Sequence, residues 1–121
     1  MDGLERWSMK VKIYNDIWKV KLVNADAKKM NPDKNHINFG LTEYAKGKIS
    51  IRAGLSESVA RSTVIHELVH AFLFSYGHTV EGEEAMCDFF GTHADEIIDL
   101  ADQIMKGVVL SVDNRRNQNV H

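Results

Sequence analysis

Cysteine, net charge and long apolar runs are all scarce in this chain of 121 residues. The single cysteine, Cys87, excludes an internal disulfide, and we expect it to be buried. A formal net charge of −2 gives no electrostatic basis for direct binding of nucleic acid. No apolar run is long enough for a membrane span, and no signal peptide or lipidation motif is evident. We therefore expect a cytoplasmic protein with no membrane partner.

The rest of the composition is ordinary for a small soluble protein, with 44% hydrophobic and 26% charged residues. A chain of this length can bury one core. The sequence predicts a single domain over residues 1–110. Residues 111–121 have few apolar side chains and several asparagines, so we expect a flexible polar tail there.

Alternation of apolar and polar residues indicates strands in the first half of the chain. Residues 18–23 alternate apolar and basic side chains, which is typical of a strand with one solvated face. Residues 37–44 and 48–52 alternate on either side of the turn at 45–47, which predicts a hairpin. Residues 1–18 fit either a strand or a short helix.

Two helices are predicted in the second half. Ser56 or Ser58 is expected to cap the first, which covers 59–76 without a glycine or proline. This segment is apolar on nearly every side, so the helix should be buried. The second helix is predicted over 79–105, with Gly107 as its stop.

The first predicted helix contains His66-Glu67-Leu68-Val69-His70, an H-E-x-x-H motif. Residues four apart share a helical face, so the two imidazoles can bind one Zn²⁺ ion. Glu67 is placed to act as general base toward a zinc-activated water. The alternative is two core histidines that are hydrogen-bonded to their neighbours. Because Glu67 accompanies the pair in an apolar helix, we favour the metal.

A catalytic zinc site usually has three protein ligands, and Glu84 is the predicted third. Asp88 lies four residues later on the same helical face. We expect it to accept a hydrogen bond from a zinc-bound histidine and so to orient that ring. Glu83 and His78 are alternative third ligands, and all the glutamates here could simply complement the helix dipole.

The two motifs together resemble the gluzincin arrangement, in which H-E-x-x-H is followed by a helix carrying E-x-x-x-D. Thermolysin-like peptidases share this plan, with a glutamate as third ligand and an aspartate behind a ligating histidine. The short chain and the stretch from Arg61 to Phe72 look more like the compact zincins of phages and mobile elements, including ImmA/IrrE-type metallopeptidases. The resemblance covers about residues 38–105. The chain departs from the family in having no evident upstream His or Tyr to stabilise an oxyanion.

This resemblance implies an α+β, zincin-like fold, in which a small mixed sheet with a hairpin packs on the H-E-x-x-H helix. A second helix would carry the third ligand. The implied function is zinc-dependent hydrolysis of a peptide bond in a protein or peptide substrate, with His66, His70 and Glu84 as ligands and Glu67 as the catalytic base. The alternative is a binding or regulatory module on the same scaffold, stabilised by metal and catalytically weak or inactive.

Overall fold

The computed structural model describes the backbone of residues 5–119 and the side chains of residues 5–111. It is a small α+β domain, which confirms the predicted class. Its elements in chain order are β1 (Glu5–Ile13), β2 (Asp16–Val23), η1 (Lys28–Met30), β3 (Gly40–Glu43), η2 (Tyr44–Lys46), β4 (Lys48–Arg52), α1 (Glu57–Ser75) and α2 (Glu83–Asn119).

The four strands form one mixed sheet in the order β1-β2-β4-β3. β1 and β2 pair antiparallel, β2 and β4 pair parallel, and β3 pairs antiparallel with β4. The hairpin predicted around residues 45–47 is confirmed, and Gly47 closes it in the left-handed conformation with φ 62°. β3 is therefore an edge strand, and it is also the strand that contacts α1 most extensively.

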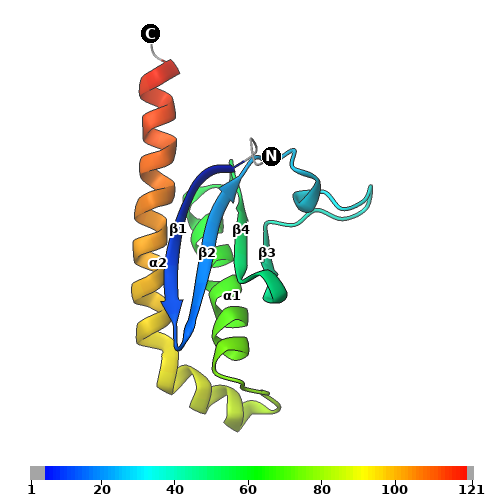
Figure 1. Cartoon of the computed structure of the whole chain (residues 1–121), viewed down its shortest axis with the longest axis vertical. Helices are drawn as coiled ribbons and strands as arrows, with labels where there is room; N and C mark the ends of the chain where they lie inside the picture. Colours follow the sequence, from blue (N-terminus) through cyan, green and yellow to red (C-terminus); the bar gives the residue numbers. More distant parts are fainter. Residues whose placement is uncertain (1–4, 120–121) are drawn as a thin grey trace.

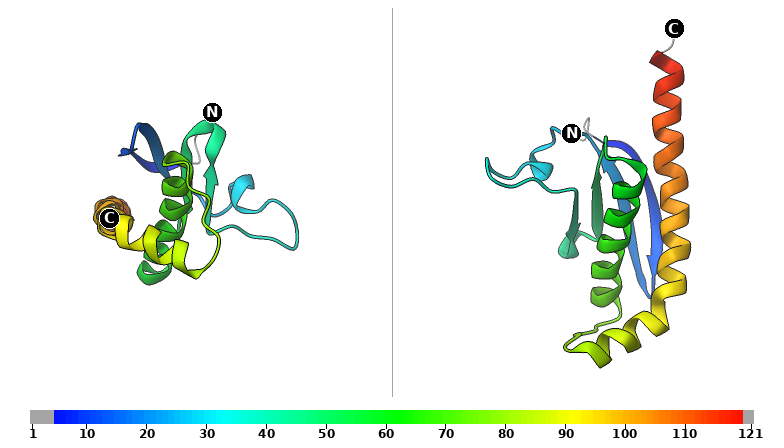
Figure 2. Two further views of the ribbon diagram at one scale, coloured as in Figure 1. Left: turned by 90° about the horizontal axis from the view of Figure 1, so that it is seen from below. Right: turned by 180° about the vertical axis from the view of Figure 1, so that it is seen from behind.

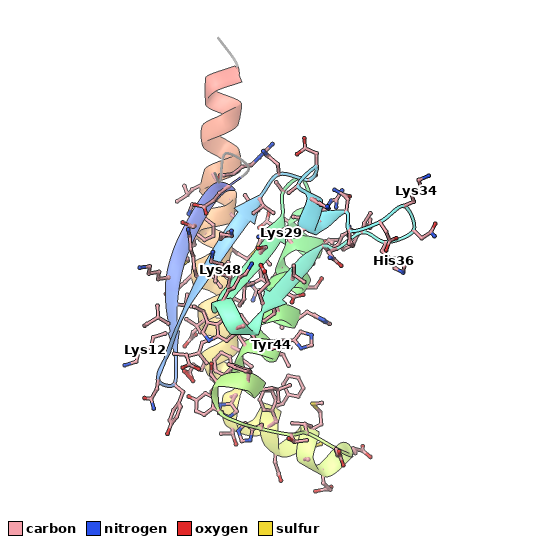
Figure 3. The ribbon with its side chains drawn as sticks, turned by 45° about the vertical axis from the view of Figure 1, so that its right-hand side comes forward. Lys12, Lys29, Lys34, His36, Tyr44 and Lys48 are labelled. Carbon is pink, nitrogen blue, oxygen red and sulfur yellow. The ribbon has the colours of Figure 1, made fainter. Side chains whose placement is uncertain are left out.

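One face of the sheet is apolar and is covered by both helices (Figure 1, Figure 2). The strand residues that reach this core are Val11, Ile13, Trp18, Val20, Leu22, Ile49 and Ile51. The intervening residues point to the opposite face, where Lys12 and Lys48 lie (Figure 3). Lys12 is exposed on that face, whereas Lys21 and Ser50 are buried there, so the face is solvated only in part.

α1 begins and ends at the residues that the sequence favours. The Ser56 hydroxyl accepts a hydrogen bond from the Val59 amide at 3.3 Å, which confirms an N-cap there. After the helix, Gly77 adopts φ 69°. The Gly77 amide donates to the Phe74 carbonyl at 3.1 Å, and the next amide donates to Leu73 at 2.8 Å. These two bonds form a Schellman motif, which ends the helix and fixes the path of the chain beyond it.

α2 differs from the prediction at both ends. It begins at Glu83, because Gly82 adopts φ 87° and lies before the helix. It continues through Gly107 to Asn119, where the sequence predicted a polar tail from residue 111; residues 120–121 lie outside the described part. The start of α2 lies across the lower end of α1, and the remainder runs up beside β1 (Figure 1). Within residues 5–119, no helix is both long and apolar enough to cross a membrane.

Gly107 is a packing residue, not a helix stop. A Cβ atom at this position would lie 2.0 Å from the Trp7 ring. The Trp7 ring, on β1, thus packs directly on the backbone of α2, and only glycine at position 107 leaves room for it. The local sequence cannot reveal this contact, since Trp7 lies 100 residues before Gly107 in the chain.

We predict that Gly107→Ala lowers the free energy of unfolding by about 1–3 kcal/mol, because the methyl group overpacks the contact with Trp7. Gly91→Ala is the matched control, since Gly91 also lies within α2 and a Cβ there meets no atom within 4 Å. The control should gain up to about 1 kcal/mol from helix propensity. Urea unfolding of both variants measures the difference, and equal gains in both would contradict the close contact.

Candidate metal centre

His66 and His70 lie on one face of α1, and their Nε2 atoms are 3.2 Å apart. In a tetrahedral site with Zn–N distances of about 2.0–2.1 Å, two ligand nitrogens lie about 3.3–3.4 Å apart. The two imidazoles therefore already have nearly the separation that a shared Zn²⁺ ion requires. Two imidazole nitrogens suit Zn²⁺, and the same 3.2 Å separation also allows a hydrogen bond between the two rings.

Tyr44 supports this pair from the sheet side. Its hydroxyl lies 3.2 Å from Nδ1 of His70, and its ring packs against Phe74 with centroids 5.1 Å apart. If Nε2 of His70 binds metal, Nδ1 carries the proton and donates a hydrogen bond to the Tyr44 oxygen. Such an outer partner fixes the tautomer and orientation of a ligating histidine.

The sequence assigned that outer role to Asp88 and missed Tyr44. Tyr44 directly follows β3, 26 residues before His70, so no helical spacing connects the two. The predicted hairpin next to the motif helix was the one signal that could have suggested it. The structure thus places an upstream tyrosine at the site where the sequence showed none.

Glu67 is held between α1 and β3, with only 6% of its surface exposed. The Thr42 hydroxyl donates a hydrogen bond to Oε1 of Glu67 at 2.6 Å. Gly40 allows this approach, because a Cβ atom there would lie 2.8 Å from Cγ and 2.9 Å from Oε2 of Glu67. The carboxylate is therefore fixed beside the edge strand and directly next to His66.

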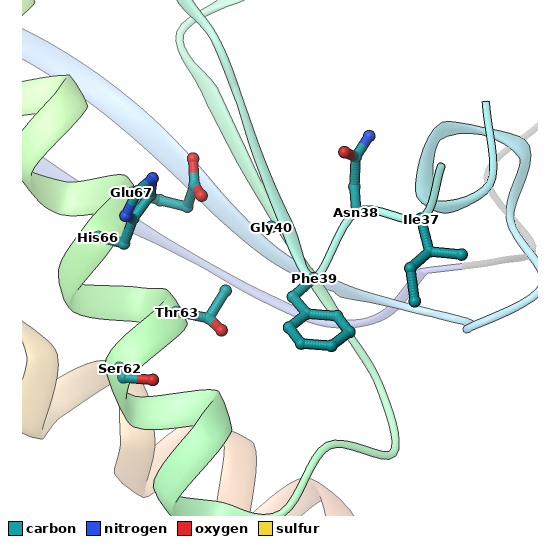
Figure 4. A pocket seen from close by; sticks show the side chains of 8 residues that line it. All are labelled: Ile37, Asn38, Phe39, Gly40, Ser62, Thr63, His66 and Glu67. Carbon is teal, nitrogen blue, oxygen red and sulfur yellow. The ribbon is translucent and has the colours of Figure 1, made fainter. Parts of the chain in front are cut away.

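A cavity of about 480 Å³ opens beside His66 and Glu67 (Figure 4). α1 forms one wall, and the segment that leads into β3 forms the other. Its lining residues are Ile37, Asn38, Phe39, Gly40, Ser62, Thr63, His66 and Glu67. Arg52 holds the second wall in place, since Nη1 donates to the carbonyls of Met30 at 3.1 Å and Asn38 at 3.5 Å.

The structure does not bring the predicted carboxylates to the histidine pair. Glu83 and Glu84 lie exposed in the first turn of α2. Asp88 lines a separate cavity of about 240 Å³ together with His78 and His93. In the part of the chain that the structure describes, no group of three or more His, Cys, Asp or Glu residues is placed to hold a metal ion. Glu84 as third ligand remains a prediction.

Two residues in the first part of α2 differ in exposure. Cys87 is exposed, and the prediction that it is buried was wrong, because most residues of the first turns of α2 are exposed. His93 is instead buried, with 6% of its surface exposed, and its Nε2 lies 3.4 Å from Nε2 of His78. Burial lowers the pKa of His93, and the neighbouring His78 lowers it further.

Comparisons with protein-family models, with curated proteins and with solved structures found no match to this chain. The zincin resemblance therefore remains a hypothesis based on the two motifs.

We predict that Thr42→Val lowers the free energy of unfolding by about 1–3 kcal/mol, because the buried Glu67 carboxylate loses its hydrogen-bond donor. Thr42→Ser keeps the hydroxyl and is the matched control, so it should lose less. Thermal and urea unfolding of the two variants give the comparison. If the Thr42→Val and Thr42→Ser variants were equally stable, the Thr42–Glu67 hydrogen bond would not hold β3 to α1.

Proposed function

We propose that the protein is a zinc-dependent metallopeptidase that hydrolyses a peptide bond in a protein or peptide substrate. The observation that carries this proposal is the 3.2 Å approach of the His66 and His70 Nε2 atoms, with Glu67 lining the same cavity as His66. The adjoining cavity and the open strand edge give a substrate access to these groups.

His66 and His70 would hold the metal, with Glu84 as the third protein ligand. Glu84 lies in the exposed first turn of α2, just after a connection that contains Gly77 and Gly82. Both glycines have positive φ, which leaves this connection free of side-chain restrictions at two points. Movement of this first turn on metal binding would complete the site, in line with the usual coupling of metal binding to folding.

Zn²⁺ bound there supplies a Lewis acid and lowers the pKa of a bound water to about 7. Glu67 would accept a proton from the attacking water while the oxygen of that water forms a bond to the carbonyl carbon of the substrate. When the C–N bond breaks, Glu67 delivers that proton to the leaving amine. Thr42 donates a hydrogen bond to Oε1 of Glu67 and so holds the carboxylate in place.

The substrate would lie extended along β3, which has no strand on its outer side within the described sheet. Backbone hydrogen bonds to such an edge bind a peptide of almost any sequence, and side-chain pockets add selectivity. Ile37 and Phe39 are exposed by 60% and 44%, and they line the cavity beside the strand. An apolar substrate side chain is the best complement to these two residues.

The contacts of Glu67 also favour a second function, a metal-stabilised binding or regulatory module with little or no catalysis. The carboxylate is 6% exposed and joins α1 to β3 through Thr42, so it has a structural role whether or not it transfers protons. The two functions share the metal site and differ only in turnover.

We predict that Glu67→Gln retains zinc but lowers cleavage by at least about 100-fold, because an amide cannot accept the proton of water. The glutamine oxygen can still accept the hydrogen bond from Thr42, so the fold should persist. Glu57→Gln, in the exposed first turn of the same helix, is the control and should change neither property. Zinc content is measured by mass spectrometry, and cleavage with a peptide library prepared from a digested cell extract.

Loss of zinc from Glu67→Gln would show that Glu67 is a ligand and would overturn this mechanism. If the wild-type protein binds zinc yet cleaves nothing in the library or in intact cell proteins, the binding module is the better description.

The third ligand is tested with two neighbouring glutamates. Glu84→Ala should lower the zinc affinity of the His66–His70 site by more than about 100-fold, beyond the usual effect of losing an outer partner. Glu83→Ala is the matched control, because both residues are exposed in the same turn of α2. Competition with a chromophoric chelator measures both affinities. Wild-type affinity in Glu84→Ala, with a loss in Glu83→Ala, would reverse the assignment.

A further inference from the structure

A second pair of histidines meets at the junction of the two helices. His78 follows the end of α1, and His93 projects from α2. Their Nε2 atoms are 3.4 Å apart, which again matches the separation of about 3.3–3.4 Å for two nitrogens on one tetrahedral metal. The proposed peptidase function uses neither residue.

The two pairs lie on different sides of α1. His70 faces Tyr44 beside the sheet edge, whereas Phe72 packs against His93 with ring centroids 5.7 Å apart. Positions 70 and 72 are about 200° apart around an ideal helix. The His78–His93 pair is therefore a separate site and not an extension of the first.

Packing alone does not explain a histidine at position 93. Its ring is 6% exposed and lies among Phe72, Tyr76 and Phe89, with the closest ring centroid, that of Tyr76, at 4.5 Å. An apolar side chain would fill this position without burying polar nitrogens. The nitrogen that is not needed for packing points instead at the nitrogen of His78.

His78 is held in place by the backbone. Its amide donates to the Leu73 carbonyl at 2.8 Å, as part of the Schellman motif that Gly77 permits. Its side chain is exposed, so an ion can reach the pair from solvent. Prearranged ligands bind a metal more tightly, because less conformational entropy is lost.

A cavity beside the pair has room for water molecules, which can fill the remaining coordination positions. It has a volume of about 240 Å³, and Asp88, Thr79 and Thr92 line it together with the two histidines. Asp88 is the charged residue in its lining. Imidazole ligands suit zinc and its first-row neighbours better than calcium or magnesium.

We propose that His78 and His93 form a second metal site, which binds Zn²⁺ or a similar first-row divalent cation and joins the end of α1 to α2. The site brackets residues 79–92, the segment that carries Glu84. Metal bound there stabilises the folded state, because the pair exists only when the end of α1 and α2 are in place. The proposal stands independently of the peptidase function, because the first histidine pair plays no part in it.

The test begins with the His66→Ala/His70→Ala double variant, which removes the first site. Equilibrium dialysis against Zn²⁺, followed by metal analysis, should find about one zinc per chain in this background. Adding His78→Gln to this variant should lower its affinity for Zn²⁺ by more than about 100-fold. Loss of a residue that only hydrogen-bonds to a metal ligand usually has a smaller effect. His36→Gln should leave the affinity unchanged. His36 is an exposed histidine paired with Asp33 in a distant loop (Figure 3).

His93→Gln should have the same effect as His78→Gln. His93 is buried, and its replacement can unfold the protein, so the variant of the exposed His78 decides the test. Circular dichroism checks that each variant is folded. The proposal is wrong if the double variant binds no zinc, or if it keeps its zinc after His78→Gln. It is also wrong if the wild-type protein binds a single zinc that His78→Gln removes, since His78 would then be the third ligand of the first site.

Discussion

The contact of β3 with α1 is the constraint on which the rest of the site depends. Gly40 lets the strand approach so closely that any side chain at that position would collide with Glu67. Thr42 then bonds to the Glu67 carboxylate, and Tyr44, just beyond the strand, reaches His70. One short edge strand and the residue after it thus position the proposed base and one proposed ligand, and the outer edge of the strand has no partner strand in the described sheet.

The two faces of α1 contact different parts of the molecule. His66 and His70 face the strand edge, whereas Phe72 and Tyr76 pack toward α2 and the buried His93. The sequence predicted a helix buried on nearly every side, but its buried residues form one stripe, and the apolar Val59 and Phe74 are 36% and 52% exposed. The same helix therefore holds a candidate catalytic pair on one side and, just beyond its end, half of a second histidine pair on the other.

The features that could be predicted are those that local sequence determines. The cap at Ser56, the stop at Gly77 and the hairpin around 45–47 all depend on neighbours within a few residues. The features that were missed depend on distant contacts. Gly107 looked like a helix stop because Trp7, which packs on it, is far away in the chain. The Tyr44 contact with His70 was missed for the same reason, as no periodicity relates a strand end to a helix face.

The central claim is that one metal ion is bound between His66 and His70. The most direct test is a crystal structure of the zinc-loaded protein, with anomalous scattering recorded at the zinc edge. The account predicts a peak about 2.0–2.1 Å from Nε2 of both histidines. A zinc-loaded crystal with no anomalous peak next to either histidine would contradict it.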